Sequence, residues 1–369
     1  MNIKLLNFNN MKKKTNFLIY PFVIMGVCLM LTSACKKDEK DDNPPADNPP
    51  VNLSYKKYLV AGSYGDIINY DIDNVNKKFR YFNETTGVSD SGTFVFSTNV
   101  NLNGVYEITA GGNFFYGIEL QNKMFATSMP SGNHQNSLCF GITADTDLST
   151  QYSTNDFVGK YIWVIYHDLS DFQWGGYEMF ANGTFTWQFG PDDDGFDEAQ
   201  HFAGAGTGTW AVSTTDPSRI IFTESSVSNI GTVYPGKYML IDNGPGMGFT
   251  AGIKYPSAPI SQASIAGSYK YIDVTPEGYL GVGAFDLPAS GTNCNVYSKY
   301  YNNPYASEEN GTMTNFHRST TINNTYIGES LFEGDLFYTS FIVLPGEALL
   351  FYTWGDIGMV SYGIAGKVN

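Results

Sequence analysis

The chain has little of what enzymes and nucleic-acid binders rely on. Its 369 residues include four cysteines, four histidines and 21 lysines and arginines, against 36 aspartates and glutamates. The formal net charge of −15 excludes a nucleic-acid partner, because such affinity comes from neutralising phosphates with basic side chains. The four histidines show no metal-ligand spacing; they are His134, His167, His201 and His317.

Sequence motifs of catalysis are also scarce. No G-x-S-x-G elbow is present, and the glycine-rich stretch from Gly204 to Gly208 leads into a predicted strand with Trp210. A phosphate loop needs a helix N-terminus at that point. Glu178 and Asp242 fall on predicted strands and are the carboxylates that a glycoside hydrolase would need. We therefore expect a protein that is not an enzyme, with a surface glycosidase as the alternative.

Cysteine usage leaves one question open. Cys28 and Cys35 belong to the N-terminal segment, so only Cys139 and Cys294 remain in the body of the chain. An exported protein can join them, but they lie far apart in sequence, and two separate buried thiols fit equally well. A disulfide-stapled scaffold is excluded, since a chain of this length can build its own core.

The N-terminus carries an export signal. Lys12, Lys13 and Lys14 precede an apolar run over residues 17–31, which is shorter than the ~20 residues of a membrane span. A basic start, a short apolar run and small residues at the end are typical of a secretory signal. The ending Leu31-Thr32-Ser33-Ala34-Cys35 resembles the lipobox of bacterial lipoproteins. The resemblance implies a signal peptide over residues 1–34, cleavage before Cys35, and acylation of this cysteine with a palmitate-type lipid.

Residues 35–53 form a predicted tether. Residues 36–50 carry lysines, acidic residues and two Pro-Pro pairs but no large apolar side chain, so we expect a disordered, stiffened spacer. The charged residues directly after Cys35 resemble the surface-export signal of Bacteroidota lipoproteins. This resemblance implies attachment to the outer membrane with the protein facing the medium. The periplasmic face is the alternative.

What the chain has in abundance is aromatic residues and glycine. Aromatic residues make up 15% of the chain, glycine occurs 39 times, and helical heptads are absent. Short alternating runs recur every 10 to 13 residues between Gly, Asn and Asp turns, for example at residues 66–71, 78–82, 184–189 and 337–343. This spacing is typical of an all-β sandwich or barrel.

The body of the chain contains three copies of one unit, over residues 54–150, 151–260 and 261–369. Each copy has a Gly-Ser/Lys-Tyr opening, an internal Gly-Thr before a bulky residue, and a closing Gly-Ile. The openings are Gly62-Ser63-Tyr64, Gly159-Lys160-Tyr161 and Gly267-Ser268-Tyr269. Each copy holds about eight candidate strands, enough to close into a barrel and remove exposed sheet edges.

The second copy resembles the lipocalin-like domains of bacterial lipoproteins. The resemblance lies in its Gly159-Lys160-Tyr161 opening and in the hairpin from Phe180 to Trp187. It implies an up-and-down barrel of eight strands, so we predict three tandem antiparallel β-barrels of this kind. A six-bladed β-propeller with four strands per blade is the alternative.

Candidate binding residues follow from the aromatic distribution. The second copy holds four of the five tryptophans, which either line a binding cavity or fill the core: Trp163, Trp174, Trp187 and Trp210. Tyr300 and Tyr301 belong to a tyrosine-rich stretch that suits either recognition or a buried strand edge. Asp192, Asp194 and Asp197 form an acidic loop that is a weak Ca²⁺ candidate, with a solvated hairpin as the simpler interpretation.

Together these features predict a surface binding module without a cofactor. Its ligand would be a glycan, a small hydrophobic molecule or a partner protein. A deep cavity lined by the tryptophans of the second copy would support such binding. A structural or adhesive surface protein is the remaining alternative.

Overall fold

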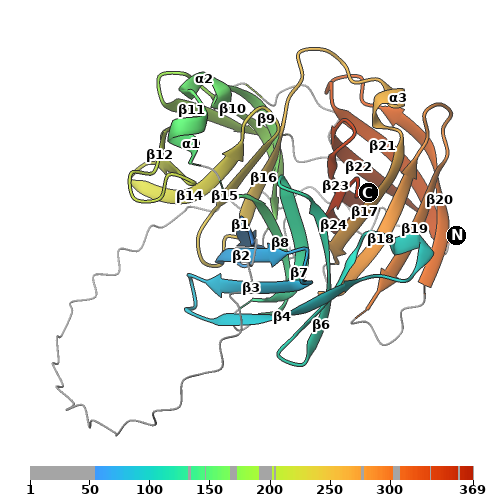
Figure 1. The fold of residues 1–369 in the computed structure, drawn as a ribbon. Helices are drawn as coiled ribbons and strands as arrows, with labels where there is room; N and C mark the ends of the chain where they lie inside the picture. The colour runs from blue at the N-terminus through green and yellow to red at the C-terminus, as the bar shows by residue number, and fades with distance from the viewer. Residues whose placement is uncertain are drawn as a thin grey trace, which may run out of the picture. The chain divides into compact units, whose positions relative to one another are not determined.

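The computed structural model confirms the predicted fold class. It consists of three closed, eight-stranded antiparallel β-barrels in tandem, coloured blue to teal, green to yellow and orange to red in Figure 1. The structure describes residues 55–131, 134–145, 147–166, 173–190, 202, 205–275, 278–301, 308–332, 334–355 and 358–368. The barrels belong to one compact unit that begins at Asn52. The strands do not form propeller blades, because the eighth strand of each copy pairs with the first.

Barrel 1 is a simple meander in which consecutive strands pair. Its closing pair joins β1 to β8, with Val60 opposite Gly141. Its strands are β1 (Lys56–Gly62), β2 (Ile67–Asp73), β3 (Lys78–Asn83), β4 (Ser89–Phe96), β5 (Tyr106–Ala110), β6 (Asn113–Leu120), β7 (Met124–Ser131) and β8 (His134–Thr143), with the short 3₁₀ helix η1 (Val100–Leu102) between β4 and β5.

Barrel 2 follows two four-residue helices, α1 (Leu148–Gln151) and α2 (Thr154–Phe157). The Asp147 side chain caps α1 by accepting from the amides of Ser149 and Thr150. The strands are β9 (Gly159–Tyr166), β10 (Gln173–Met179), β11 (Thr184–Phe189), β12 (Gly206–Val212), β13 (Ile220–Glu224), β14 (Val227–Tyr234), β15 (Tyr238–Asp242) and β16 (Phe249–Lys254).

Barrel 3 follows the helix α3 (Gln262–Ile265). Its strands are β17 (Gly267–Val274), β18 (Leu280–Leu287), β19 (Cys294–Tyr300), β20 (Glu308–Arg318), β21 (Thr325–Phe332), β22 (Asp335–Leu344), β23 (Ala348–Gly355) and β24 (Gly358–Gly366). None of the helices in the described ranges has the length and apolar character needed to cross a bilayer.

The opening motif of the first copy was placed wrongly from the sequence. Gly159 and Gly267 begin β9 and β17, whereas Gly62 is the last residue of β1. The residue that corresponds to Tyr161 and Tyr269 is therefore Tyr58, two positions into its strand. All three tyrosines are buried. The sequence Gly62-Ser63-Tyr64 resembles the openings of the other copies by chance. The strand β1 begins with Lys56-Lys57, where β9 and β17 begin with a glycine.

The internal Gly-Thr motif has a physical reason. Gly92 and Gly208 lie opposite Phe79 and Phe185 on the preceding strand. A Cβ atom at either glycine would come within 2.8 Å or 2.4 Å of that aromatic ring. The glycine therefore lets the ring lie flat across the neighbouring strand inside the barrel. The third copy has Val296 opposite Gly311, and a Cβ there would meet nothing within 4 Å.

The core has four parts. Three clusters fill the barrel interiors and are rich in aromatic side chains. The fourth contains outward-facing residues of all three barrels, including Phe140, Phe249 and Ile364. Strands at this shared cluster are buried on both faces, as in β15, where all five residues are buried. Such strands lose the alternation of a half-exposed strand and become continuous apolar runs.

Candidate functional site

A pocket of about 600 Å³ lies where barrels 1 and 3 meet. We call it the junction pocket. Hydrogen-bonding and charged side chains dominate its lining: Asn74, Tyr106, Glu119, Lys123, Glu347 and Lys367. The barrel 1 residues come from the β2–β3 turn, the start of β5 and the β6–β7 turn. In a meander these connections share one end of the barrel, which is also the end where β1 begins.

Glu119 forms one wall of the junction pocket. It is the penultimate residue of the apolar strand β6 and is 7% exposed. Its carboxylate accepts hydrogen bonds from the hydroxyls of Tyr58 and Tyr106, and from the Asn74 amide at 2.7 Å. Burial raises the pKa of both tyrosines well above its ordinary value, and the neighbouring carboxylate raises it further. The phenols therefore stay neutral and act as fixed donors.

Glu347 forms a second wall and joins the three barrels. It lies in the β22–β23 turn of barrel 3 and is bonded by Lys123 of barrel 1 at 3.1 Å and by Lys237 of barrel 2. The Tyr238 hydroxyl donates to it at 2.9 Å. Burial works against the charge, but the donors Lys237, Lys123 and Tyr238 outweigh it and hold the pKa of Glu347 below its ordinary value.

The three residues of this ion cluster occupy the same place in the three repeats. Lys123, Lys237 and Glu347 each directly precede the seventh strand of a barrel. Each carbonyl also accepts the same backbone hydrogen bond, from the amides of Thr143, Lys254 and Lys367 respectively. The equivalent turns of three barrels thus converge, and the third copy alone supplies a negative charge.

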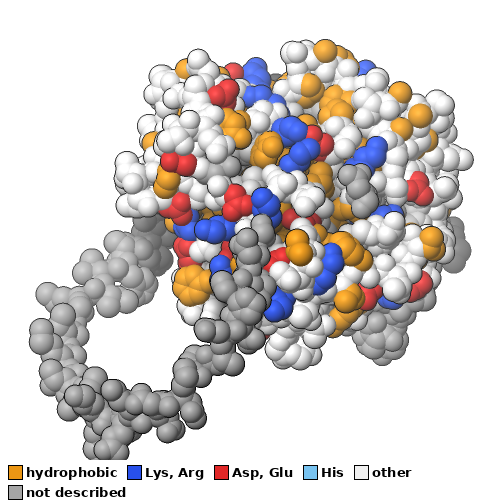
Figure 2. All heavy atoms as spheres, in the orientation of Figure 1, with side chains coloured by type: hydrophobic (Ala, Val, Ile, Leu, Met, Phe, Trp, Pro, Cys, Tyr) orange, Lys and Arg blue, Asp and Glu red, His pale blue; other side chains and the backbone are white. Residues whose placement is uncertain are grey.

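Lys367 brings a further positive charge to the junction pocket. It directly follows β24, and its Nζ donates to the carbonyl of Ala266 at 2.9 Å. The ammonium also lies 5.9 Å from the centre of the Tyr269 ring. Lysine has three N–H donors, so these contacts leave donor capacity for the pocket. On the face drawn in Figure 2, lysine and arginine side chains gather near the middle, with acidic side chains between them.

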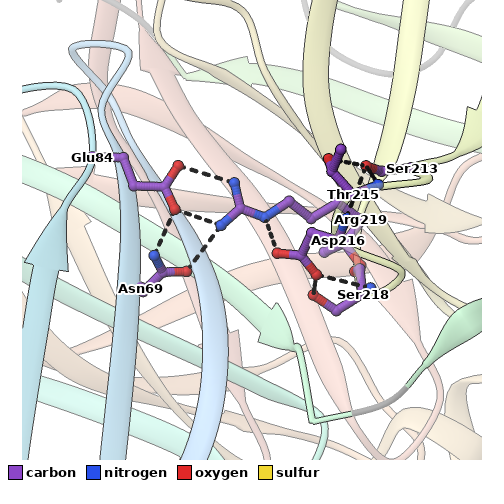
Figure 3. Close-up of polar contacts among 8 residues, drawn as sticks. Asn69, Glu84, Ser213, Thr215, Asp216, Ser218 and Arg219 are labelled. Carbon is purple, nitrogen blue, oxygen red and sulfur yellow. Dashed lines mark hydrogen bonds and ion pairs between the residues drawn. The ribbon is translucent and has the colours of Figure 1, made fainter.

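A separate polar cluster joins barrels 1 and 2 (Figure 3). Arg219, just before β13, donates to Glu84 at 2.9 Å and to the Asn69 side chain at 3.2 Å, and its Nε lies 2.7 Å from Asp216. Hydrogen bonds from Arg219 hold the pKa of Glu84 below its ordinary value against the effect of burial. This cluster has the geometry of a structural ion pair and lines no pocket that we describe.

The four predicted tryptophans divide into three buried rings and one partly exposed ring. Trp163, Trp174 and Trp210 are 3%, 4% and 6% exposed. Trp163 and Trp210 belong to the interior cluster of barrel 2, and Trp174 to the shared cluster. Trp187 is half-buried, donates to Glu224 at 2.9 Å, and lies 4.8 Å from the exposed Phe189 ring. Their ligand-binding role stays a prediction.

The predicted tyrosines lie at the end of β19. Tyr300 is half-buried, and Tyr301 packs edge-on against Tyr116 of barrel 1 at 4.9 Å and is hydrogen-bonded to Ser128. Tyr301 therefore lies in the contact between barrels 1 and 3. Cys139 and Cys294 are free and buried, which answers the question left open by the sequence.

The remaining predicted sites cannot be placed. Cys35 and the acidic loop residues Asp192, Asp194 and Asp197 lie outside the described residues. Within the part of the chain that is described, no three His, Cys, Asp or Glu side chains are grouped so that they could hold a metal ion.

Comparison with known proteins adds little. No family model matches the chain, and no curated protein matches it. Among solved structures, two mutants of transferrin binding protein B from Haemophilus parasuis Hp5 match with 9% and 10% identity and TM-scores of 0.26 and 0.25. Each match covers 82% of this chain and 65% of that one, so the match spans less than two thirds of those proteins. Intact Ap-TbpB matches over 85% and 77% of the two chains, with 7% identity and a TM-score of 0.22. At these TM-scores the likeness carries no argument here.

The residues of the junction pocket were missed at the sequence level. The signal that could have found them is the pair of turns Pro235-Gly236-Lys237 and Pro345-Gly346-Glu347. These turns match in the repeats but end in opposite charges. Two equivalent positions with opposite charges are candidates for a contact between repeats.

Proposed function

We propose that this chain is a non-enzymatic binding protein, anchored by a lipid on Cys35 to the outer membrane and facing the medium, that takes a polar ligand of the glycan class in the junction pocket. The observation that supports this is the pocket itself. Its volume of about 600 Å³ falls within the ~300–1,000 Å³ of small-molecule sites. Its polar groups are held in place by contacts that several strands and all three barrels contribute.

A polar ligand fits better than a hydrophobic one. The barrel interiors, where a lipocalin-like protein would hold an apolar ligand, contain aromatic rings packed against one another. Examples are Tyr70 with Phe125 at 4.6 Å in barrel 1 and Tyr271 with Phe285 at 4.6 Å in barrel 3. A hydrophobic ligand would have to displace such rings. The junction pocket offers hydroxyl, amide, carboxylate and ammonium groups instead.

Binding also fits better than hydrolysis. A glycosidase needs one carboxylic acid with a raised pKa to protonate the leaving group. In the junction pocket the pKa of Glu347 is lowered, and the oxygens of Glu119 already accept hydrogen bonds from Tyr58, Tyr106 and Asn74. Glu178, which the glycosidase alternative had named, is a surface residue of β10 that lies 3.9 Å from Lys160. Asp242, the second carboxylate of that alternative, has a pKa that burial raises to about 6, but it does not line the junction pocket. Neither carboxylate of the glycosidase alternative therefore belongs to this pocket.

The pocket is tested by binding measurements on the soluble body of the chain. We would measure heats of binding for a panel of neutral and acidic oligosaccharides. Glu119→Gln and Tyr106→Phe should each weaken the binding of a neutral oligosaccharide about tenfold, because the first replaces a carboxylate acceptor by an amide and the second removes a hydroxyl. Glu178→Gln and Tyr338→Phe, which alter surface positions on β10 and β22, are the matched controls. Absence of binding by every saccharide, or equal loss in the controls, would refute the proposal.

The lipid anchor is tested separately. Mass spectrometry of the protein extracted from membranes should find an N-terminus at Cys35 that carries fatty acids. The Cys35→Ala variant should lose this mass and leave the membrane fraction. Protease treatment of whole cells should degrade the native protein if it faces the medium, and spare it if it faces the periplasm.

A partner protein is a second candidate, because apolar side chains lie exposed near the pocket. Val75 and Val100, in connections at the pocket end of barrel 1, are 82% and 85% exposed, and Phe96 on the pocket lining is 44% exposed. Exposed apolar patches mark interaction sites. Val75→Asp and Val100→Asp should then reduce crosslinking to an outer-membrane protein, while Val227→Asp on barrel 2 should not. Equal crosslinking in all three would remove this candidate.

A further inference from the structure

We propose that the ligand of the junction pocket is an acidic saccharide, whose carboxylate or sulfate group is bound by Lys123 and Lys367. This inference rests on the proposed function and narrows its ligand class. The saccharide ring would lie against the Tyr106 and Phe96 side of the pocket.

The charges around the pocket are unequal. Three ammonium groups, those of Lys123, Lys237 and Lys367, lie at or beside the lining, and Glu347 is the one carboxylate that pairs with two of them. The other carboxylate, Glu119, is held by protein donors and neutralises no lysine in the described contacts. The lysine side of the pocket therefore carries excess positive charge, although the whole chain is at −15.

Lys123 is the group that can turn to a ligand. Its side chain is 33% exposed and it contacts one oxygen of Glu347, Oε1, at 3.1 Å. The same oxygen also accepts from Lys237, and Oε2 accepts from Tyr238. An incoming anion can therefore replace Glu347 as the partner of Lys123, while Glu347 keeps the donors Lys237 and Tyr238 of barrel 2. Lys367 adds a second ammonium to the lining of the same pocket, so a carboxylate or sulfate that enters it meets two cations.

A cationic ligand fits less well. Among the described residues that line the pocket, Glu119 is the carboxylate without a lysine contact, and Tyr58, Tyr106 and Asn74 already donate to its two oxygens. These three donors leave an ammonium at most one acceptor site, on Oε1 of a residue that is 7% exposed, and a closer contact would displace a buried donor at a cost.

The aromatic side of the pocket suits the apolar face of a sugar ring. Phe96 is 44% exposed and lies 5.2 Å from Tyr106, and both line the pocket. The Lys77 ammonium lies 4.1 Å from the centre of the Phe96 ring and adds positive charge at this rim. Hydrogen-bond donors, a flat aromatic surface and two ammonium groups together match an acidic sugar better than a free inorganic anion.

The test compares two probes of equal length, an oligogalacturonate and a neutral galactan oligosaccharide, with sodium sulfate as a third probe. We expect the acidic oligosaccharide to bind about tenfold more tightly at low salt and to lose this advantage in 0.5 M NaCl. Equal affinity of the two saccharides at low salt would overturn the inference but leave the proposed function standing. Binding of neither saccharide would overturn both. Sulfate that binds as tightly as the acidic saccharide would show an anion site without sugar recognition, and would also overturn the inference.

Two lysine variants separate ligand contact from structural support. Lys123→Gln should abolish the preference for the acidic saccharide while neutral binding persists. Lys237→Gln removes the other lysine of Glu347 but lies outside the pocket lining, so it should lower the melting temperature comparably and leave the preference intact. Loss of the preference in both variants would show that the junction, and not a lysine–anion contact, determines it.

Discussion

Asp273 should make the protein less stable at neutral pH than at pH 5. Asp273 is 3% exposed. It lies two positions after Tyr271 on β17, so its side chain shares the face that packs inside barrel 3. Burial raises the pKa of this carboxyl from 3.8 to about 7, although a hydrogen bond with Ser361 partly compensates. The Oδ1 atom has no hydrogen-bond partner in the described structure. Tyr271 and Tyr301 face the group and are neutral hydroxyls at these pH values.

The sign follows from proton binding. Between pH 3.8 and about 7 the folded protein keeps the proton on Asp273 and the unfolded chain has lost it. The free energy of unfolding therefore falls as the pH rises through this range, by ~1.4 kcal/mol for each pH unit. From pH 5 to pH 8 the loss amounts to ~2–3 kcal/mol, and it levels off above the folded-state pKa.

The Asp273→Asn variant replaces the titrating carboxyl group by an amide of nearly the same size and shape, which does not titrate. Its free energy of unfolding, relative to the native chain, should rise by ~2–3 kcal/mol between pH 5 and pH 8. If the compact unit unfolds cooperatively, this equals a relative shift in melting temperature of ~3–6 °C. Thermal melts of the native chain, Asp273→Asn and the exposed control Asp286→Asn at both pH values provide the measurement. Parallel pH profiles for the native chain and Asp273→Asn would refute the reasoning.

Three further predictions test the contacts between barrels by urea unfolding, two of them with a matched comparison variant. Glu347→Gln should lower the free energy of unfolding by ~1–3 kcal/mol. It should lower it more than Lys237→Gln does, because only Glu347→Gln leaves two facing ammonium groups unpaired. An equal loss in the two variants would contradict this. Arg219→Gln should cost ~1–2 kcal/mol, and less in 1 M salt; a loss that salt does not change would argue against an ionic contact. Gly65→Ala should cost more than ~2 kcal/mol, because the backbone has φ +78° and the new Cβ would lie 1.8 Å from a barrel 2 carbonyl oxygen. Gly87→Ala has φ +74° but open space and should cost only ~1 kcal/mol, so similar losses would show that the contact is irrelevant.

The barrels could be predicted from the sequence because successive residues of a barrel strand face the interior and the outside in turn. Apolar and polar residues therefore alternate in runs such as residues 184–189, and this run forms β11. The Gly-Thr motif is also local, since the glycine lies directly opposite the ring that it accommodates on the neighbouring strand. Spacing, repeat number and meander order follow from such neighbour contacts.

The packing between barrels could not be predicted in the same way. Outward-facing residues meet a different barrel, and nothing in the spacing of the repeats says which strands come together. Tyr238–Asp242 is a run of five buried residues because one face of β15 packs inside barrel 2 and the other joins the shared cluster. From the sequence the buried tryptophans Trp163 and Trp210 suited a cavity or a core equally, and only the packing of barrel 2 shows their surroundings.

The junction shows how a small difference between copies can produce both an assembly and a site. Three identical copies with lysine at the position of Lys123 and Lys237 would bring three ammonium groups together, and their repulsion would oppose the contact. Glutamate at 347 converts this repulsion into attraction, because one carboxylate accepts from both lysines. A single carboxylate cannot neutralise two lysines, so the arrangement that joins the barrels also leaves positive charge at the edge of the pocket. Under the proposal above, Lys123 supports the junction and also contacts the ligand, whereas Lys237 supports the junction and lies outside the lining. Variants of these two lysines therefore distinguish the two roles.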